Sequence, residues 1–146
     1  MSHTKPLTLR ASSAQVAGSE TGTEANSGAH KHQKIYTAAV FFLDVTALAN
    51  DVNDTLDVYI DVSLDGGTSW INAIHFPQIL GNGSAAKHVA KLNHSIATPL
   101  HVVTADLAAN AARQIGLGTM IRYRGDVVDP TGSNATFTYT LKAFLH

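Results

Sequence analysis

Residues 54–76 have the sequence DTLDVYIDVSLDGGTSWINAIHF and contain the most regular alternation in the 146-residue chain. Every second residue from Leu56 to Leu64 is apolar, and the residues between them are Asp57, Tyr59, Asp61 and Ser63. A strict period of two predicts an antiparallel strand with one face in the core and the other in water. Residues 65–67 are Asp-Gly-Gly, which tolerate positive φ, and extended character resumes at 69–76. We therefore predict a β-hairpin over 54–76.

The segment before this hairpin, IYTAAVFFLDVTAL at 35–48, is apolar on both alternation phases. Such a strand is expected to be covered on both faces. Two explanations remain open from sequence. The second face, with Val40 and Phe42, contacts another subunit, or the strand is central and overlain by loops.

The C-terminal third returns to strands at 119–128 and 135–145. The six residues between them, DPTGSN, are strong turn formers, so a second hairpin is predicted over 119–145.

The middle of the chain is less regular. Short strands are predicted at 86–92 and 100–104. The only helix-like run is 105–116, where Asp106 is a possible cap and Asn110 limits the helix to one or two turns.

The N-terminal part has a short apolar stretch at 7–9, followed by small and polar residues without periodicity. We expect residues 1–34 to be an N-terminal strand and a flexible loop or arm, and residues 35–146 to be the body of a single domain. The predicted fold is all-β, an antiparallel β-sandwich of jelly-roll or Greek-key type with at most one short helix.

Composition excludes several function classes. Ten Lys and Arg against eleven Asp and Glu give a net charge of −1, and 14% of residues are charged where about 25% is usual. The basic residues are scattered singly, so a protein that grips nucleic acid through phosphates is not expected. Cysteine is absent, which excludes thiolate chemistry and Cys-bound zinc.

Targeting signals are not apparent either. The first twenty residues lack the apolar run of a secretory signal, and 18 apolar residues never occur together, so we expect a soluble protein with no membrane partner. The 45% of hydrophobic residues then requires either a large core or a surface that is covered by other protein.

Residues 63–70, SLDGGTSW, fit the Asp-box pattern of a hairpin turn. The aspartate of such a turn accepts hydrogen bonds from turn amides, a glycine supplies positive φ, and the tryptophan packs the turn onto the sheet. Asp-boxes occur in sugar-active propellers, but in several copies, and this chain has one. We interpret it as a structural turn, whose members are Ser63, Asp65, Gly66, Gly67 and Trp70.

Two other sets of residues have chemistry to consider. His30 and His32 would point the same way on an extended chain and could share a metal, but no third ligand is defined. Asp57 and Asp61 lie two side-chain steps apart on the same face of one strand, close to the separation that glycosidase carboxylates use. Charged outward positions are also what solubility requires, and nucleophile motifs are absent, so no catalytic residue, metal or cofactor is predicted.

The strand at 119–128 carries Arg122, Tyr123 and Arg124 in succession. Basic and aromatic residues together are found in grooves for single-stranded nucleic acid. Two arginines on an outward face are explained more simply as a solvated or partner-contacting face. We take these three residues as interface candidates, together with Val40 and Phe42.

The order of these motifs resembles the small β-sandwich structural proteins of tailed bacteriophages. The resemblance covers about residues 7–145 and rests on the Thr-Leu-Asp-Val strand, the Ser-x-Asp-Gly-Gly-Thr-x-Trp turn, the Arg-containing strand and the closing Phe-Thr-Tyr strand. The long loop at 17–34, with its His-Lys-His-Gln-Lys cluster, departs from the family pattern.

The resemblance implies a non-enzymatic virion component that decorates or cements the outer surface of a capsid across capsomer boundaries. The implied partners are the major capsid protein and two further copies of the chain in a homotrimer. The alternative is a sugar-binding module of a head fibre, in which Trp70, Tyr59 and Tyr123 stack on host glycans. An enzyme is the third possibility and predicts a pocket with converging carboxylates or histidines.

Overall fold

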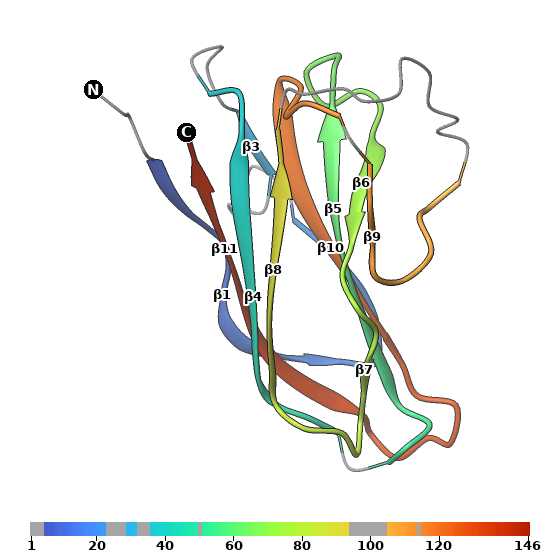
Figure 1. The fold of residues 1–146 in the computed structure, drawn as a ribbon. Helices are drawn as coiled ribbons and strands as arrows, with labels where there is room; N and C mark the ends of the chain where they lie inside the picture. The colour runs from blue at the N-terminus through green and yellow to red at the C-terminus, as the bar shows by residue number, and fades with distance from the viewer. Residues whose placement is uncertain (1–4, 23–28, 32–35, 50, 94–104, 114) are drawn as a thin grey trace.

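The computed structural model describes residues 5–22, 29–31, 36–49, 51–93, 105–113 and 115–146. They form two antiparallel sheets packed face to face, and no described residue is helical. Figure 1 shows the two layers, with β11, β4 and β8 in one and β10, β5 and β6 in the other. The predicted all-β sandwich is therefore confirmed.

Sheet A has four strands in the order β1-β11-β4-β8. Its members are β1 (Lys5–Val16), β11 (Thr136–Leu145), β4 (Ala39–Ala47) and β8 (Ala86–Leu92). β4 pairs with β11 on one side and with β8 on the other, so the doubly apolar segment of the sequence is an inner strand of its sheet.

Sheet B has the strand order β2-β10-β5-β6-β9, and its centre is the nine-residue pairing of β5 with β10. In addition, β3 pairs with β10 and β7 pairs with β5. Its members are β2 (Gly18–Thr21), β3 (Ala29–Lys31), β5 (Thr55–Ser63), β6 (Ile71–His75), β7 (Ile79–Leu80), β9 (Ala111–Ala112) and β10 (Met120–Val128). The predicted hairpin over 54–76 is confirmed by the β5–β6 pairing.

The core fills the space between the sheets with the inward phases of the long strands. Each of these side chains is almost completely excluded from water, and the group includes Phe41, Leu43, Leu56, Val58, Ile60, Ile121, Phe137, Tyr139 and Leu141. Burying one such side chain contributes about 1.5–3 kcal/mol, so the inward-facing residues of the strands stabilise the packing of the two sheets.

The second predicted hairpin is wrong. Strands form at both expected places, but β10 pairs within sheet B and β11 pairs within sheet A. Residues 129–134 therefore cross from one sheet to the other. Turn-forming residues mark where a chain reverses, and they do not specify whether the next strand pairs or crosses the core.

The predicted helix is also not found. In the described part of 105–116 the chain has a turn at 109–110 and then forms β9, which pairs with β6 through Ala111 and His75. Asn110 has a φ of 62°, a left-handed conformation that cannot continue an α-helix.

The expected N-terminal loop is partly strand. β1 extends to Val16, and β2 and β3 add to the edge of sheet B through β10. Of the two short strands predicted in the middle, β8 confirms 86–92, and 100–104 lies outside the described residues.

Candidate functional site: the outer faces of the two sheets

The turn between β5 and β6 has the expected Asp-box geometry. The Ser69 amide donates to Asp65 Oδ1 at 2.8 Å, and the Gly67 amide donates to Ser63 Oγ at 2.8 Å. Gly66 and Gly67 have φ of 72° and 96°, as a turn of this kind requires. A Cβ atom on Gly67 would lie 3.6 Å from the Trp70 ring, so the tryptophan lies against the turn.

Asp65 is exposed but strongly hydrogen-bonded. Bonds from the Ser69 hydroxyl and amide, and from Ser63, lower its pKa to about 2. Its two carboxylate oxygens are occupied by the turn, which supports the structural interpretation of this motif.

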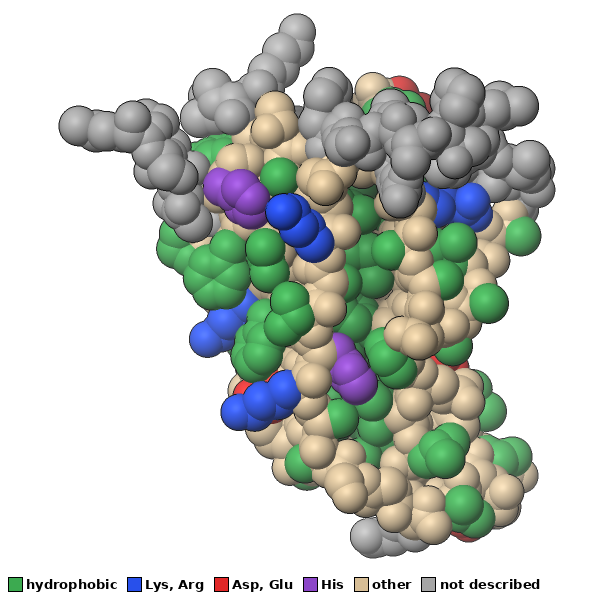
Figure 2. Space-filling model, viewed as in Figure 1, with side chains coloured by type: hydrophobic (Ala, Val, Ile, Leu, Met, Phe, Trp, Pro, Cys, Tyr) green, Lys and Arg blue, Asp and Glu red, His purple; other side chains and the backbone are tan. Residues whose placement is uncertain are grey.

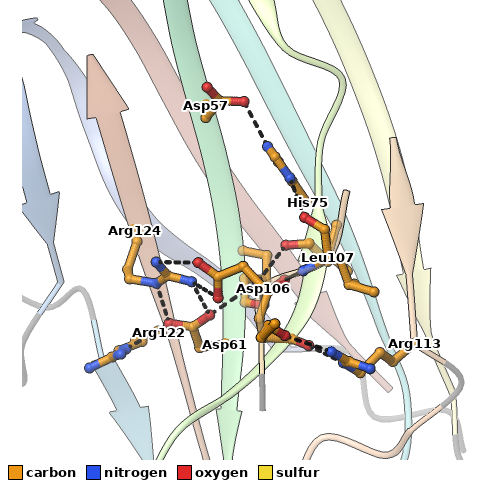
Figure 3. Close-up of polar contacts among 12 residues, drawn as sticks. Asp57, Asp61, His75, Asp106, Leu107, Arg113, Arg122 and Arg124 are labelled. Atoms are coloured by element: carbon orange, nitrogen blue, oxygen red, sulfur yellow. Dashed lines mark hydrogen bonds and ion pairs between the residues drawn. The ribbon is translucent and has the colours of Figure 1, made fainter. Parts of the chain in front are cut away.

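The outer face of sheet B carries a charged cluster centred on Asp61 (Figure 3). Its carboxylate, which is 2% exposed, lies 3.0 Å from Arg122 Nε and 2.7 Å from Arg124 Nε. Arg124 also reaches Asp106 at 2.8 Å. Burial opposes the charge on Arg124, but hydrogen bonds to Asp61 and Asp106 raise its pKa above the usual value.

Both arginines of this cluster also stack on aromatic rings. Arg122 lies 4.3 Å above the centre of the Trp70 ring, and Arg124 lies 4.4 Å above that of Tyr59. Burial, with the nearby carboxylates, raises the pKa of Tyr59 to about 12. The arginines therefore join Asp61 to the aromatic residues of the same face.

A second polar group on this face fastens the segment 105–113 to the sheet (Figure 3). His75 Nε2 lies 2.7 Å from Asp57 Oδ1, and its Nδ1 lies 2.8 Å from the carbonyl oxygen of Leu107. Gln78 donates to the other oxygen of Asp57 at 2.8 Å. The histidine ring therefore links Asp57 of β5 to the backbone at Leu107.

These contacts change the interpretation of the Asp57 and Asp61 pair. The alternation predicted an outward face in water, but Asp57 is 9% exposed and Asp61 is 1% exposed. Asp61 is paired with two arginines, and Asp57 is bonded to a histidine and a glutamine. Both carboxylates hold neighbouring strands and loops together, which is a structural role.

The three consecutive interface candidates of β10 point in different directions. Arg122 and Arg124 face outward into the Asp61 cluster, with side chains 22% and 20% exposed. Tyr123 points into the interior, is 4% exposed and donates its hydroxyl proton to Glu20. The structure therefore does not place Tyr123 on an outer surface.

A third cluster, which the sequence did not predict, ties the N-terminal strands to the body. Arg10 is buried, lies 2.8 Å from Glu20 and donates to the Tyr139 carbonyl at 2.7 Å. Partial burial opposes the charge on Glu20, but bonds from Arg10 and Tyr123 outweigh it and hold its pKa below the ordinary value. In the sequence, the pair is visible only as an arginine and a glutamate ten residues apart in a segment without periodicity, which does not predict a contact.

Beside it, Gln15 donates to the Gly125 carbonyl at 2.8 Å and accepts a bond from the Tyr139 hydroxyl at 2.5 Å. Gly125 provides the space for this contact, since a Cβ there would lie 2.1 Å from the Tyr139 oxygen.

The outer face of sheet A carries an apolar patch. Phe144 of β11 lies opposite Val40 of β4, and Phe42 of β4 lies opposite Val89 of β8. Val40 and Phe42 are half-buried, whereas Val89 is 67% and Phe144 is 39% exposed. These four residues, which we call the sheet A patch, form two adjoining cross-strand pairs.

Lysines border the sheet A patch. Lys142 lies opposite Phe42, Lys91 lies opposite Val40, and Lys87 lies opposite Asp44 one step further along. These three lysines and Asp44 together carry a net charge of +2. Figure 2 shows hydrophobic side chains with Lys and Arg among them on this side of the molecule.

Neither a metal site nor a membrane-spanning helix is found among the described residues. They contain no group of three His, Cys, Asp or Glu side chains that could hold a metal ion, and no helix that could cross a membrane. The pair His30 and His32 is not tested, because the side chain of His30 and all of His32 lie outside what the structure describes.

Comparison of the chain with protein-family models, with curated proteins and with solved structures found no significant match.

Proposed function

We propose that the protein is a non-enzymatic structural component of a virion that binds the outer surface of a capsid through the outer face of sheet A. The observation that carries the proposal is the sheet A patch, in which apolar side chains from three strands adjoin on the outer face and two of them, Val89 and Phe144, are exposed. Flat apolar faces bordered by charge are typical of protein interfaces.

The sequence resemblance and the low charge support the same proposal. A chain with 14% charged residues exposes few groups that resist desolvation, and a cement protein has to lose water over a broad surface. Such a protein stabilises a particle by burying surface across the boundary between capsomers, so that expansion must break those contacts as well.

The proposed assembly is a homotrimer on the major capsid protein. Three linked copies engage three sites at once, so modest affinity at each site gives tight attachment overall. Val40 and Phe42 of β4 and the lysines of β8 would then face the capsid from each copy.

Sugar binding receives less support from the aromatic residues named for it. One face of Trp70 is covered by Arg122, and Tyr59 has Arg124 over its ring and His75 at 4.1 Å between ring centres. Tyr123 is buried. Stacking on a sugar requires a free aromatic face, so host glycan recognition stays the second candidate.

The test is co-sedimentation of the purified protein with capsids that lack it. Wild-type protein is expected to bind saturably, and Val89→Glu is expected to weaken binding at least tenfold because it places a charge in the sheet A patch. Val128→Glu is the matched control, since Val128 is 51% exposed at the end of β10 in the other sheet.

The solution mass of the free protein completes this test. A trimer that binds capsids and loses binding only in Val89→Glu supports the proposal. A monomer that does not bind, or equal losses in the two variants, would overturn it.

A further inference from the structure

Among the described strands, β8 lies at the edge of sheet A. It pairs with β4 over seven residues, and within the described part of the chain no strand pairs with its other side. The backbone groups of alternate residues on that side are consequently available to a further strand.

A groove runs beside this free edge. It has a volume of about 290 Å³ and is lined on one side by Ile74, Phe76 and Pro77, and on the other by His88 and Ala90. Ala111 and Ala112 of β9, which pairs with β6, also line the groove. Such a groove would receive small side chains from the inner face of an added strand.

His88 provides a polar contact in that groove. It faces inward, opposite Leu43, and its Nε2 atom is buried without a hydrogen-bond partner. A buried polar atom without a partner costs free energy, which a hydroxyl from an incoming strand would recover once the His88 ring turns towards the groove.

The charges on β8 discriminate between possible occupants. Lys87, Val89 and Lys91 project from the outer face of the strand. If a second copy paired its whole β8 antiparallel to this one, Lys87 would lie opposite Lys91 twice, and like charges directly opposite are destabilising. Lysines on an edge strand commonly prevent such self-pairing.

We infer that β8 binds an extended segment of another protein as a fifth, antiparallel strand of sheet A, and that this segment carries two carboxylates four residues apart. The carboxylates lie opposite Lys87 and Lys91, an apolar residue lies opposite Val89, and a serine or threonine lies opposite His88. This site is the edge of the sheet, not its face, and the inference holds whether or not the partner is a capsid.

The probe is a capped peptide with the sequence Thr-Glu-Ala-Val-Ser-Glu-Thr, titrated into the full-length ¹⁵N-labelled protein. We expect saturable amide shifts confined to β8 and to the groove residues. The double variant Lys87→Glu/Lys91→Glu is expected to bind this peptide roughly tenfold more weakly and to regain binding with a peptide in which lysines replace the glutamates.

Two controls make the result specific. Lys142→Glu removes the same type of charge from the same face on β11, away from the edge, and is expected to leave binding unchanged. Replacing the peptide serine by alanine is expected to weaken binding to wild type but not to His88→Ala.

The inference would be overturned if the peptide caused no saturable shift at β8, or if the glutamate and lysine peptides bound the wild-type protein with equal affinity. It would also be overturned if Lys142→Glu weakened peptide binding as much as Lys87→Glu/Lys91→Glu does. If capsid binding fails while the peptide binds as described, only the proposed function fails.

Discussion

On the outer face of sheet B, ion pairs rather than apolar contacts fix the positions of individual side chains. Asp61 is almost completely buried and is shared by two arginines, whereas Asp106, which contacts Arg124 on its other side, is 50% exposed. The same type of ion pair therefore occurs here in two environments, which predicts two different contributions to stability.

Replacing Asp61 with Asn is expected to lower the free energy of unfolding by about 3 kcal/mol, because two arginines lose a buried partner. Asp106→Asn is expected to cost less than about 1 kcal/mol, because the lost pair is exposed to water. Urea denaturation of both variants measures the difference, and equal losses would contradict it.

Gly125 predicts a steric effect. A methyl group there meets the Tyr139 hydroxyl at 2.1 Å and Gln15 Oε1 at 2.6 Å, so Gly125→Ala is expected to lose about 1–3 kcal/mol of stability. In the background of Tyr139→Phe the added loss is expected to be smaller, since one of the two blocking atoms is gone. A double-mutant cycle measured by thermal unfolding checks this, and strict additivity would contradict the described packing.

At the scale of elements, the Asp-box turn predicts a pH dependence. The pKa of Asp65 is lowered to about 2 in the folded protein, mainly by its bonds with Ser69, and is near 3.9 in an unfolded chain. A carboxyl group with a lowered pKa stabilises the fold above about pH 4, and this contribution is lost as the pH falls towards 2.

The acid limb of the stability curve is therefore expected to be shallower in Asp65→Asn than in wild type. Asp129 has a similarly lowered pKa of about 2 from its bonds to the Ala135 and Ser133 amides, so the variant retains part of the slope. Melting temperatures between pH 7 and pH 2 measure this effect, and parallel curves for the two proteins would show that the turn does not contribute.

The strands and turns show which features of the fold depend on residues that are near one another in the sequence and could therefore be predicted from it. The period of two in β5 predicted its inward face correctly, and the Asp-Gly-Gly turn predicted its hairpin with β6. The outward face was misjudged because Arg122, Arg124 and residues 105–113 cover it, and these lie far along the chain. Likewise, the turn formers at 129–134 could not reveal that β10 and β11 join different sheets.

At the scale of the whole molecule, the two outer faces differ in kind. The outer face of sheet B is closed by its own salt bridges and by the segment around Leu107. The outer face of sheet A has no such covering from described residues over Val89 and Phe144, which remain exposed. Sequence identified half of that face through the doubly apolar β4, but Val89 and Phe144 join Val40 and Phe42 only through strand pairing.

The whole structure also shows where the few charged residues of the chain lie. Several of its few charged residues are buried in structural pairs, including Arg10, Asp57 and Asp61, and are not available to keep the surface polar. The charge of the exposed surface is thus lower than the composition alone suggests, and it is one of the supports of the proposed function.

The most direct test is a cryo-EM reconstruction of capsids incubated with the protein, compared with capsids that lack it. We predict additional density for three copies around a symmetry axis, with the outer face of sheet A, including Val40, Phe42, Val89 and Phe144, turned towards the capsid. Attachment through the Arg122 and Arg124 face of sheet B, or the absence of additional density at saturating protein, would contradict the account.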